Sequence, residues 1–232
     1  MAIGRVINEI KSILFYDFLN NIAYDKSGWQ LELFLQIPNL VKVDILECFE
    51  YVILDLATGP FREDNGIREL DSQFLEYPRD ILDKKLLEND TKSSYASEYI
   101  NIIGQLFLAG YIEFGMCGLQ DKEENLLSNQ KEDKYQSWVY FRDNFFYENA
   151  YNRDMIEVRE KYKDMSDDDY IYSTWDTPQF WDKYRFWVTR TPKGTKYFNE
   201  ILAPKFYNKY KDLEVEIDDK GNIIKWIGKV NR

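Results

Sequence analysis

The spacing of apolar side chains predicts amphipathic helices in the first quarter of the chain. Residues 3–22 repeat apolar side chains at three- and four-residue steps, which is the period of a helix buried along one face. On the same grounds we expect a second helix from Pro38 to about Leu56. Between them, residues 29–37 alternate apolar and polar side chains like a strand, but they also fit one helical stripe, so both assignments stay open.

A helix followed by a strand is predicted near the middle of the chain. Ser93 or Ser94 fits the N-terminal cap of a helix that runs to about Ala109. Gly110 fits the left-handed residue that commonly ends such a helix. Residues 111–117 follow directly with the composition of a strand, and residues 184–190 have the same character.

Thr191-Pro192 predicts the start of a further helix, because threonine caps helices and proline loses no hydrogen bond in the first turn. We expect this helix to end near Leu202, before Pro204. A β-hairpin that joins residues 213–217 to residues 222–228 is then predicted.

These elements together predict an α+β fold that is mainly helical and carries a C-terminal β-hairpin. The length fits one domain over residues 1–232, with an insertion at about residues 118–182 as the alternative. Whether residues 113–182 are an insertion or a second lobe stays open.

The chain has no histidine, and this narrows the chemistry available to it. Ser-His-Asp and Cys-His nucleophiles are excluded, as are zinc sites that contain histidine. Cys48 and Cys117 are far apart in sequence, which excludes a four-cysteine zinc site and favours two reduced core residues. We therefore assign no catalytic residue, no metal and no cofactor, and we expect that the protein is not an enzyme.

The N-terminal sequence lacks the pattern of a secretion signal. Asn8, Glu9 and Lys11 interrupt the apolar run that a signal peptide requires. No run approaches the eighteen apolar residues of a membrane span. We therefore expect a cytoplasmic protein that does not contact membranes.

Charge is distributed unevenly along the chain, whose net charge is −11. Residues 1–112 carry −8 and residues 113–182 carry −9, whereas residues 183–232 carry +6. Such a field repels phosphate backbones and accelerates association with cationic partners. The charge therefore favours a basic protein partner and makes nucleic acid an improbable one.

Aromatic side chains are abundant at 17%, and many lie among the acidic residues of the middle segment. Tyrosine and tryptophan supply large contact area at low entropic cost, so aromatic rings beside carboxylates are typical of protein-binding faces. Burial in a core is the alternative, and it is the better interpretation for phenylalanine. The predicted partner-binding residues are Asp167, Asp168, Asp169, Tyr170, Tyr172, Trp175 and Asp176.

Other charged groups have residue types that occur in metal-binding or phosphate-binding sites. Asp167, Asp168 and Asp169 could bind Mg²⁺ or Ca²⁺, but they lack the ligand spacing of a calcium loop, so a solvated turn is favoured. A second group faintly resembles the acidic ligands and lysine of metal-dependent nucleases: Glu214, Glu216, Asp218 and Lys220. Solvated charge on the hairpin explains these better. A solvated helix face likewise explains the basic tract of Lys193, Lys196, Lys205, Lys209 and Lys211.

Two segments together resemble the wing region of winged-helix proteins. They are INIIGQLFLAGYIEF at 100–114 and FWVTRTPKGTKYFNEI at 186–201, and the second contains a Thr-Pro-x-Gly turn. The resemblance implies a helix, two paired wing strands and a further helix, here with a long acidic insertion between the strands. Because fold does not fix function, such an element could bind nucleic acid or serve only as a scaffold.

By type alone, the chain is also similar to bacterial immunity proteins, which neutralise toxin domains. That resemblance implies a non-enzymatic inhibitor that binds a basic toxin or effector, and it is our leading hypothesis. A winged-helix nucleic-acid-binding or regulatory protein is the first alternative. A carboxylate- and metal-dependent hydrolase is the second.

Overall fold

The computed structural model describes residues 1–16, 33–57, 96–116, 125–148, 150–153, 155–165, 173–182 and 185–232. The chain forms two compact units. Met1–Asp55 and Thr195–Arg232 make up the first unit, and Leu56–Gly194 makes up the second. The described part is α+β and about half helical, with small antiparallel sheets. The expectations of a single domain and of an insertion at about 118–182 stay predictions.

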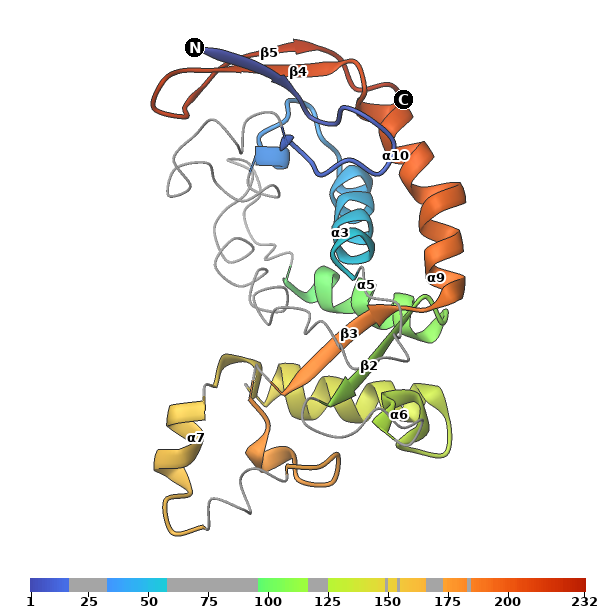
Figure 1. Cartoon of the computed structure of the whole chain (residues 1–232), viewed down its shortest axis with the longest axis vertical. Helices are drawn as coiled ribbons and strands as arrows, with labels where there is room; N and C mark the ends of the chain where they lie inside the picture. The colour runs from blue at the N-terminus through green and yellow to red at the C-terminus, as the bar shows by residue number, and fades with distance from the viewer. Residues whose placement is uncertain are drawn as a thin grey trace, which may run out of the picture. The chain divides into compact units, whose positions relative to one another are not determined.

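The first unit contains a three-stranded antiparallel sheet, shown in Figure 1. Its strands are β1 (Ala2–Arg5), β4 (Leu213–Ile217) and β5 (Ile223–Gly228), in the order β1-β4-β5. The β4–β5 hairpin confirms the hairpin predicted from the sequence. Alternate residues of β4 are buried, so the sheet has one face on the core and one toward solvent.

The N-terminal helix expected over residues 3–22 is wrong for the part that the structure describes. Residues 2–5 form β1, which pairs with β4 across more than two hundred residues of sequence. Lys11 and Phe15 then adopt left-handed backbone angles, which interrupt any helix there. The helical spacing of apolar residues was overridden by strand pairing, a contact that a local pattern does not reveal. Residues 17–22 lie outside the described residues.

Helix α3 (Lys42–Leu56) ends where the sequence predicted but begins four residues later. Asn39 has a left-handed φ of 61°, which asparagine tolerates better than most residues. The carboxylate of Asp44 accepts a hydrogen bond of 2.9 Å from the amide of Val41 and so satisfies a free donor at the helix start. Of the ambiguous segment 29–37, residues 33–37 form helical turns.

A second long helical stretch belongs to the first unit from Thr195 onward. It consists of α9 (Pro192–Tyr197), the π-helical segment η6 (Phe198–Leu202) and α10 (Ala203–Tyr210). The sequence predicted an end before Pro204, and this is wrong. The π turn shifts the hydrogen-bonding pattern just before the proline, where the missing N–H would otherwise interrupt the helix. The rings of Tyr51 and Phe206 stack between α3 and α10 with centroids 4.3 Å apart.

The second unit contains a two-stranded sheet next to a helix. Helix α5 (Ala96–Leu108) is followed by Gly110 with φ +74° and by β2 (Ile112–Met116). Strand β2 pairs antiparallel with β3 (Phe186–Arg190). The helix end, the left-handed glycine and both strands agree with the sequence predictions. The expected caps Ser93 and Ser94 lie outside the described residues.

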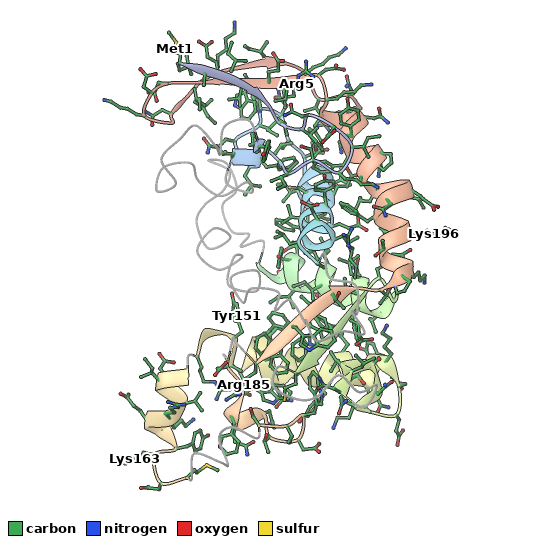
Figure 2. All side chains as sticks on the ribbon, viewed as in Figure 1. Met1, Arg5, Tyr151, Lys163, Arg185 and Lys196 are labelled. Carbon is green, nitrogen blue, oxygen red and sulfur yellow. The ribbon has the colours of Figure 1, made fainter. Side chains whose placement is uncertain are left out.

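The remaining elements of the second unit lie between β2 and β3 in sequence. Side chains fill the space between these strands and α6 (Lys134–Phe141), as Figure 2 shows. The helical elements are η2 (Leu127–Asn129), α6 (Lys134–Phe141), η3 (Arg142–Tyr147), η4 (Ala150–Asn152), α7 (Met155–Lys161) and η5 (Pro178–Phe180).

Cys48 is a free thiol in the core of the first unit. Burial raises its pKa well above the ordinary value, so the thiol stays protonated and unreactive. This agrees with the predicted core role. Cys117 lies outside the described residues.

Candidate functional site

The predicted partner-binding segment lies only partly within the described residues. Trp175 and Asp176 are described, and they belong to a short turn formed by residues 174–177. Outside the described residues lie Asp167, Asp168, Asp169, Tyr170 and Tyr172.

The ring of Trp175 is part of the aromatic core of the second unit and is only 5% exposed. Its centroid lies 5.2 Å from that of Phe186 and 5.8 Å from that of Trp181. Its indole N–H donates a 3.0 Å hydrogen bond to the carbonyl of Asn125. The ring therefore fixes the turn to the core, and Asp176 is the member of the predicted set that the structure shows exposed to solvent.

Further hydrogen bonds hold the 174–177 turn in one conformation. The amide of Thr174 donates to the Thr177 hydroxyl at 2.7 Å, and the Trp181 indole donates to the Thr174 carbonyl at 2.9 Å. The Tyr140 hydroxyl donates to the carbonyl of Trp175 at 2.7 Å. Asp176 is thus an exposed carboxylate on a turn that is held on several sides. Such a group loses little conformational entropy when a partner binds.

The Tyr140 side chain connects this turn to α6. Burial raises the pKa of Tyr140, and the negative charge of Asp176 raises it further. The ammonium of Lys131 lies 4.0 Å from the centre of the same ring. The hydroxyl therefore stays protonated and remains a hydrogen-bond donor to the turn.

Aromatic residues of the middle segment mostly form the core around Phe141. Its ring centroid lies 4.9 Å from that of Phe186 and 5.0 Å from those of Phe114 and Phe145. Pairs at these spacings stabilise a core beyond the area they bury, by about 0.5–1.5 kcal/mol each. The burial of these phenylalanines agrees with the interpretation favoured from the sequence.

Two tyrosines of this region are exposed, and the sequence analysis did not single them out. Tyr135 and Tyr147 are 61% and 58% exposed. Arg142 lies between them in sequence, with its guanidinium 5.3 Å from the ring of Tyr147 and 2.7 Å from Oδ1 of Asp143. Exposed tyrosines beside a paired arginine have the composition of a binding surface. Helical spacing did not mark Tyr135 as exposed, because it lies three residues before the buried Trp138 and so on the same side of an ideal helix.

Glu113 is a buried carboxylate in β2. Its Oε1 accepts hydrogen bonds from the amides of Phe114 at 3.1 Å and Ser128 at 3.2 Å. Burial raises its pKa, although these two bonds and the charge of Lys134 oppose the rise. Burial also lowers the pKa of Lys134, whose ammonium lies 4.4 Å from the ring centre of Phe107. Perturbed groups of this kind can exchange protons, but ion networks within a fold perturb pKa values as well.

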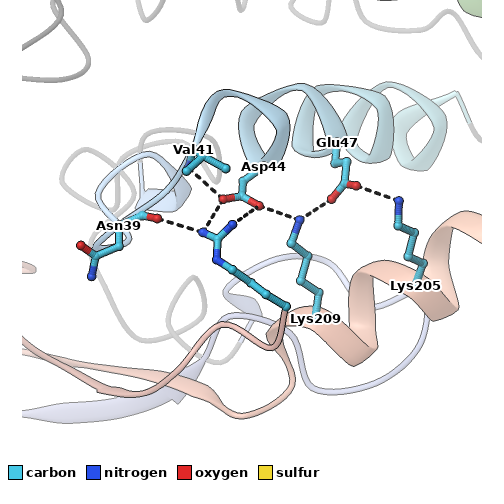
Figure 3. Close-up of polar contacts among 7 residues, drawn as sticks. Asn39, Val41, Asp44, Glu47, Lys205 and Lys209 are labelled. Carbon is cyan, nitrogen blue, oxygen red and sulfur yellow. Dashed lines mark hydrogen bonds and ion pairs between the residues drawn. The ribbon is translucent and has the colours of Figure 1, made fainter.

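A network of ion pairs joins α3 to α10 in the first unit, as Figure 3 shows. Lys209 bridges Asp44 and Glu47, with its ammonium 2.6 Å from Oδ1 of Asp44. Lys205 contacts Glu47 at 2.7 Å, and Arg232 contacts Asp44 at 2.7 Å. Asp44 has no exposed surface, so the surrounding donors replace the water that this carboxylate has lost.

This network also changes the interpretation of the basic tract. Lys205 and Lys209 are paired with carboxylates. Lys193 donates to the carbonyl of Ala109 at 2.7 Å, at the end of α5. These three lysines therefore already have acceptors that a phosphate would have to displace.

The acidic residues of the hairpin lie as the sequence predicted. Glu214 and Glu216 share the outer face of β4, because the residues between and beside them are buried. Glu214 pairs with Arg5 at 3.3 Å, and Asp218 accepts hydrogen bonds from the amides of Lys220 and Asn222 within the turn. Among the described residues, no group of three or more His, Cys, Asp or Glu is arranged to hold a metal ion.

Comparisons with known proteins give no family for the chain: no protein-family model, no curated protein and no solved structure matches it. In the parts of the chain that the structure describes, no helix is both long and apolar enough to cross a bilayer.

Proposed function

We propose that the protein is a non-enzymatic binding protein, an immunity or inhibitor protein of the bacterial type, that neutralises a basic toxin or effector. The acidic segment around residues 164–182 forms the binding face. The observation that carries the proposal is the rigid 174–177 turn, which presents the exposed Asp176 while the Trp175 ring fixes the turn to the core.

The physics of the segment fits recognition of a cationic surface. Asp167, Asp168 and Asp169 precede the turn in sequence and add three negative charges to that of Asp176. Complementary charge accelerates encounter and suppresses partners of the wrong sign. The buried ring of Trp175 holds the turn in place and is not itself available for contact. The contacts with the partner therefore come from the carboxylates and from the other rings of the segment.

A pull-down with the product of the neighbouring gene tests the proposal. The site variant changes Asp167, Asp168, Asp169 and Asp176 to Asn. The control variant changes exposed acids elsewhere to Gln and removes the same amount of charge: Glu9, Glu132, Glu160 and Glu200. Trp175 is left unchanged, because removing a buried ring would confuse loss of binding with loss of folding.

We expect the site variant to bind about tenfold more weakly or worse, and the control to lose little, since four charges at one face act together. Binding that survives the site variant unweakened would exclude this face. An equal loss in both variants would mean that net charge alone drives the association.

A winged-helix-like nucleic-acid-binding or regulatory protein is a second candidate, favoured by the pairing of β2 with β3. The hydroxyl of Thr191 donates to the carbonyl of Gly110 at 2.6 Å and accepts from the amide of Gly194 at 3.0 Å. These bonds connect the end of α5 to the start of α9, and the order helix, paired strands, helix is the one that the resemblance implies.

Gel shifts of labelled duplex DNA at low and high salt test this second candidate. Binding that weakens steeply with salt would favour it, because each phosphate contact releases counterions. The engagement of Lys193, Lys205 and Lys209 by acceptors within the chain predicts weak binding. No shift at low salt would remove the candidate.

A further inference from the structure

The first unit contains a cleft of about 280 Å³ beside the end of β5. Its walls come from the turn at residues 37–39, from the first residue of β4 and from the segment that follows β5. The volume lies near the lower end for small-molecule sites, which span about 300–1,000 Å³. A ligand of this cleft would therefore be small.

The lining combines apolar walls with positive charge. Ile37, Pro38, Leu213 and Val230 supply the apolar surface, and Trp226 supplies a half-buried indole. Two further lining residues, Lys229 and Arg232, are cations, and no Asp or Glu side chain lines the cleft among the described residues. Both cations belong to residues 183–232, the segment that carries +6 in a chain of net charge −11.

The ion-pair network of Figure 3 extends to this cleft through Arg232. Arg232 is engaged, since it donates to Asp44 at 2.7 Å and to the carbonyl of Asn39 at 2.8 Å. Because Arg232 is paired with Asp44, the remaining positive charge of the cleft comes from Lys229. An anion entering the cleft would gain from this remaining positive field.

Two hydrogen-bond donors of the cleft have no acceptor within the described part of the chain. They are the ammonium of Lys229 and the indole N–H of Trp226. A small site typically combines apolar walls with a few polar groups of this kind, which fix the orientation of the ligand. Both residues line the same cleft, three positions apart at the end of β5.

We propose that this cleft binds a small aromatic carboxylate. The ring of the ligand lies against the apolar walls and the indole of Trp226, and its carboxylate accepts from Lys229 and from the indole N–H. This binding is separate from the proposed protein-binding face, which belongs to the second unit.

Calorimetric titration of the full chain with indole-3-acetate and with its neutral analogue indole-3-acetamide tests the proposal. We expect one site that binds the carboxylate about threefold to fivefold more tightly than the amide, as one partly exposed charge pair provides. Added salt should weaken binding of the carboxylate only. No binding of either compound, or equal binding of both, would overturn the proposal.

Variants of the exposed lysines locate the site. Lys229→Met should remove the preference for the carboxylate, and Lys229→Arg should keep it. Lys225→Met is the matched control, because Lys225 is exposed on β5 and does not line the cleft. Trp226→Phe keeps an aromatic ring in the wall of the cleft but removes the indole N–H, so it should weaken binding of the carboxylate. A preference that survives Lys229→Met, or is lost with Lys225→Met, would place the anion elsewhere and contradict the proposal.

Discussion

The ammonium of Lys209 lies 2.6 Å from Oδ1 of Asp44, a carboxylate with no exposed surface. This pair joins α10 to α3 in the first unit, and each partner has a second contact of opposite charge. A buried pair need not be a net source of stability, but removing one partner leaves a charge without water or counter-ion.

Removing Lys209 should therefore cost much more than removing its neighbour Lys205. Removing one partner of a buried ion pair usually costs about 3–5 kcal/mol. We expect Lys209→Met to lower the free energy of unfolding by somewhat less, about 2–4 kcal/mol, because Arg232 still pairs with Asp44. The side chain of Lys205 is 62% exposed, so Lys205→Met should cost less than about 1 kcal/mol. Urea denaturation of both variants measures the difference, and equal losses would contradict the assignment.

The same network predicts how stability changes in acid. Burial acts to raise the pKa of Asp44, but hydrogen bonds from Lys209, Val41 and Arg232 outweigh burial and hold the pKa below its ordinary value. A carboxyl group with a lowered folded pKa stabilises the fold above its unfolded pKa of about 3.9, and that stabilisation is lost as the pH falls further. Asp44→Asn should thus be destabilising at neutral pH, and the difference from wild type should narrow below about pH 4. A difference that stays constant from neutral to acid pH would contradict this.

Glu113 should show the opposite dependence. Its raised pKa means that the folded chain binds the proton more tightly, so stability declines as the pH rises from the unfolded pKa of about 4.3 toward the folded value. In Glu113→Gln one amide oxygen can still accept from Phe114 and Ser128, because both bonds end on Oε1. We expect this variant to be as stable as wild type or up to about 1 kcal/mol more stable at pH 7, with a flatter pH profile. Thermal unfolding across pH 4 to 8 tests it, and a destabilised variant with an unchanged profile would show that the charge is needed.

Gly194 should be required for the junction between α9 and the strand pair. A Cβ at this position would lie 1.9 Å from the backbone oxygen of Tyr111, which cannot move like a side chain. Gly194→Ala should therefore cost about 1–3 kcal/mol, as overpacking does. Thr195→Ala, at the next and exposed position of the same helix, should change stability by less than about 0.5 kcal/mol. Denaturant unfolding of the two variants measures this difference in stability. Equal stabilities would show that the start of α9 can shift to accommodate the Cβ, which would contradict the prediction.

The sequence was informative where the signals are local. Turn glycines, helix caps and short apolar runs specify three elements through residues that are adjacent in sequence. These elements are the hairpin, the strand after Gly110 and the start of α9. Residues 2–5 and Pro204 were misassigned because their structure depends on a distant strand and on a π turn. Neither the strand pairing nor the π turn can be recognised from the spacing of apolar residues.

The same distinction between local signals and tertiary contacts applies to the candidate site. The sequence located the acidic segment, but it could not separate the buried Trp175 from the exposed Asp176, because adjacent residues of a turn can face opposite ways. Nor could it assemble the cleft, whose lining comes from segments more than 170 residues apart. Which rings lie in the core is decided by tertiary packing around Phe141.

The rate at which the chain associates with the product of the neighbouring gene tests the proposed binding face most directly. The measurement compares Asp176→Lys with Glu200→Lys, which make the same charge change at two exposed positions, at low and at high salt. We predict that Asp176→Lys slows association about tenfold or more at low salt while Glu200→Lys has a much smaller effect, because steering depends on charge at the contact face. Equal rates for the two variants would contradict the account.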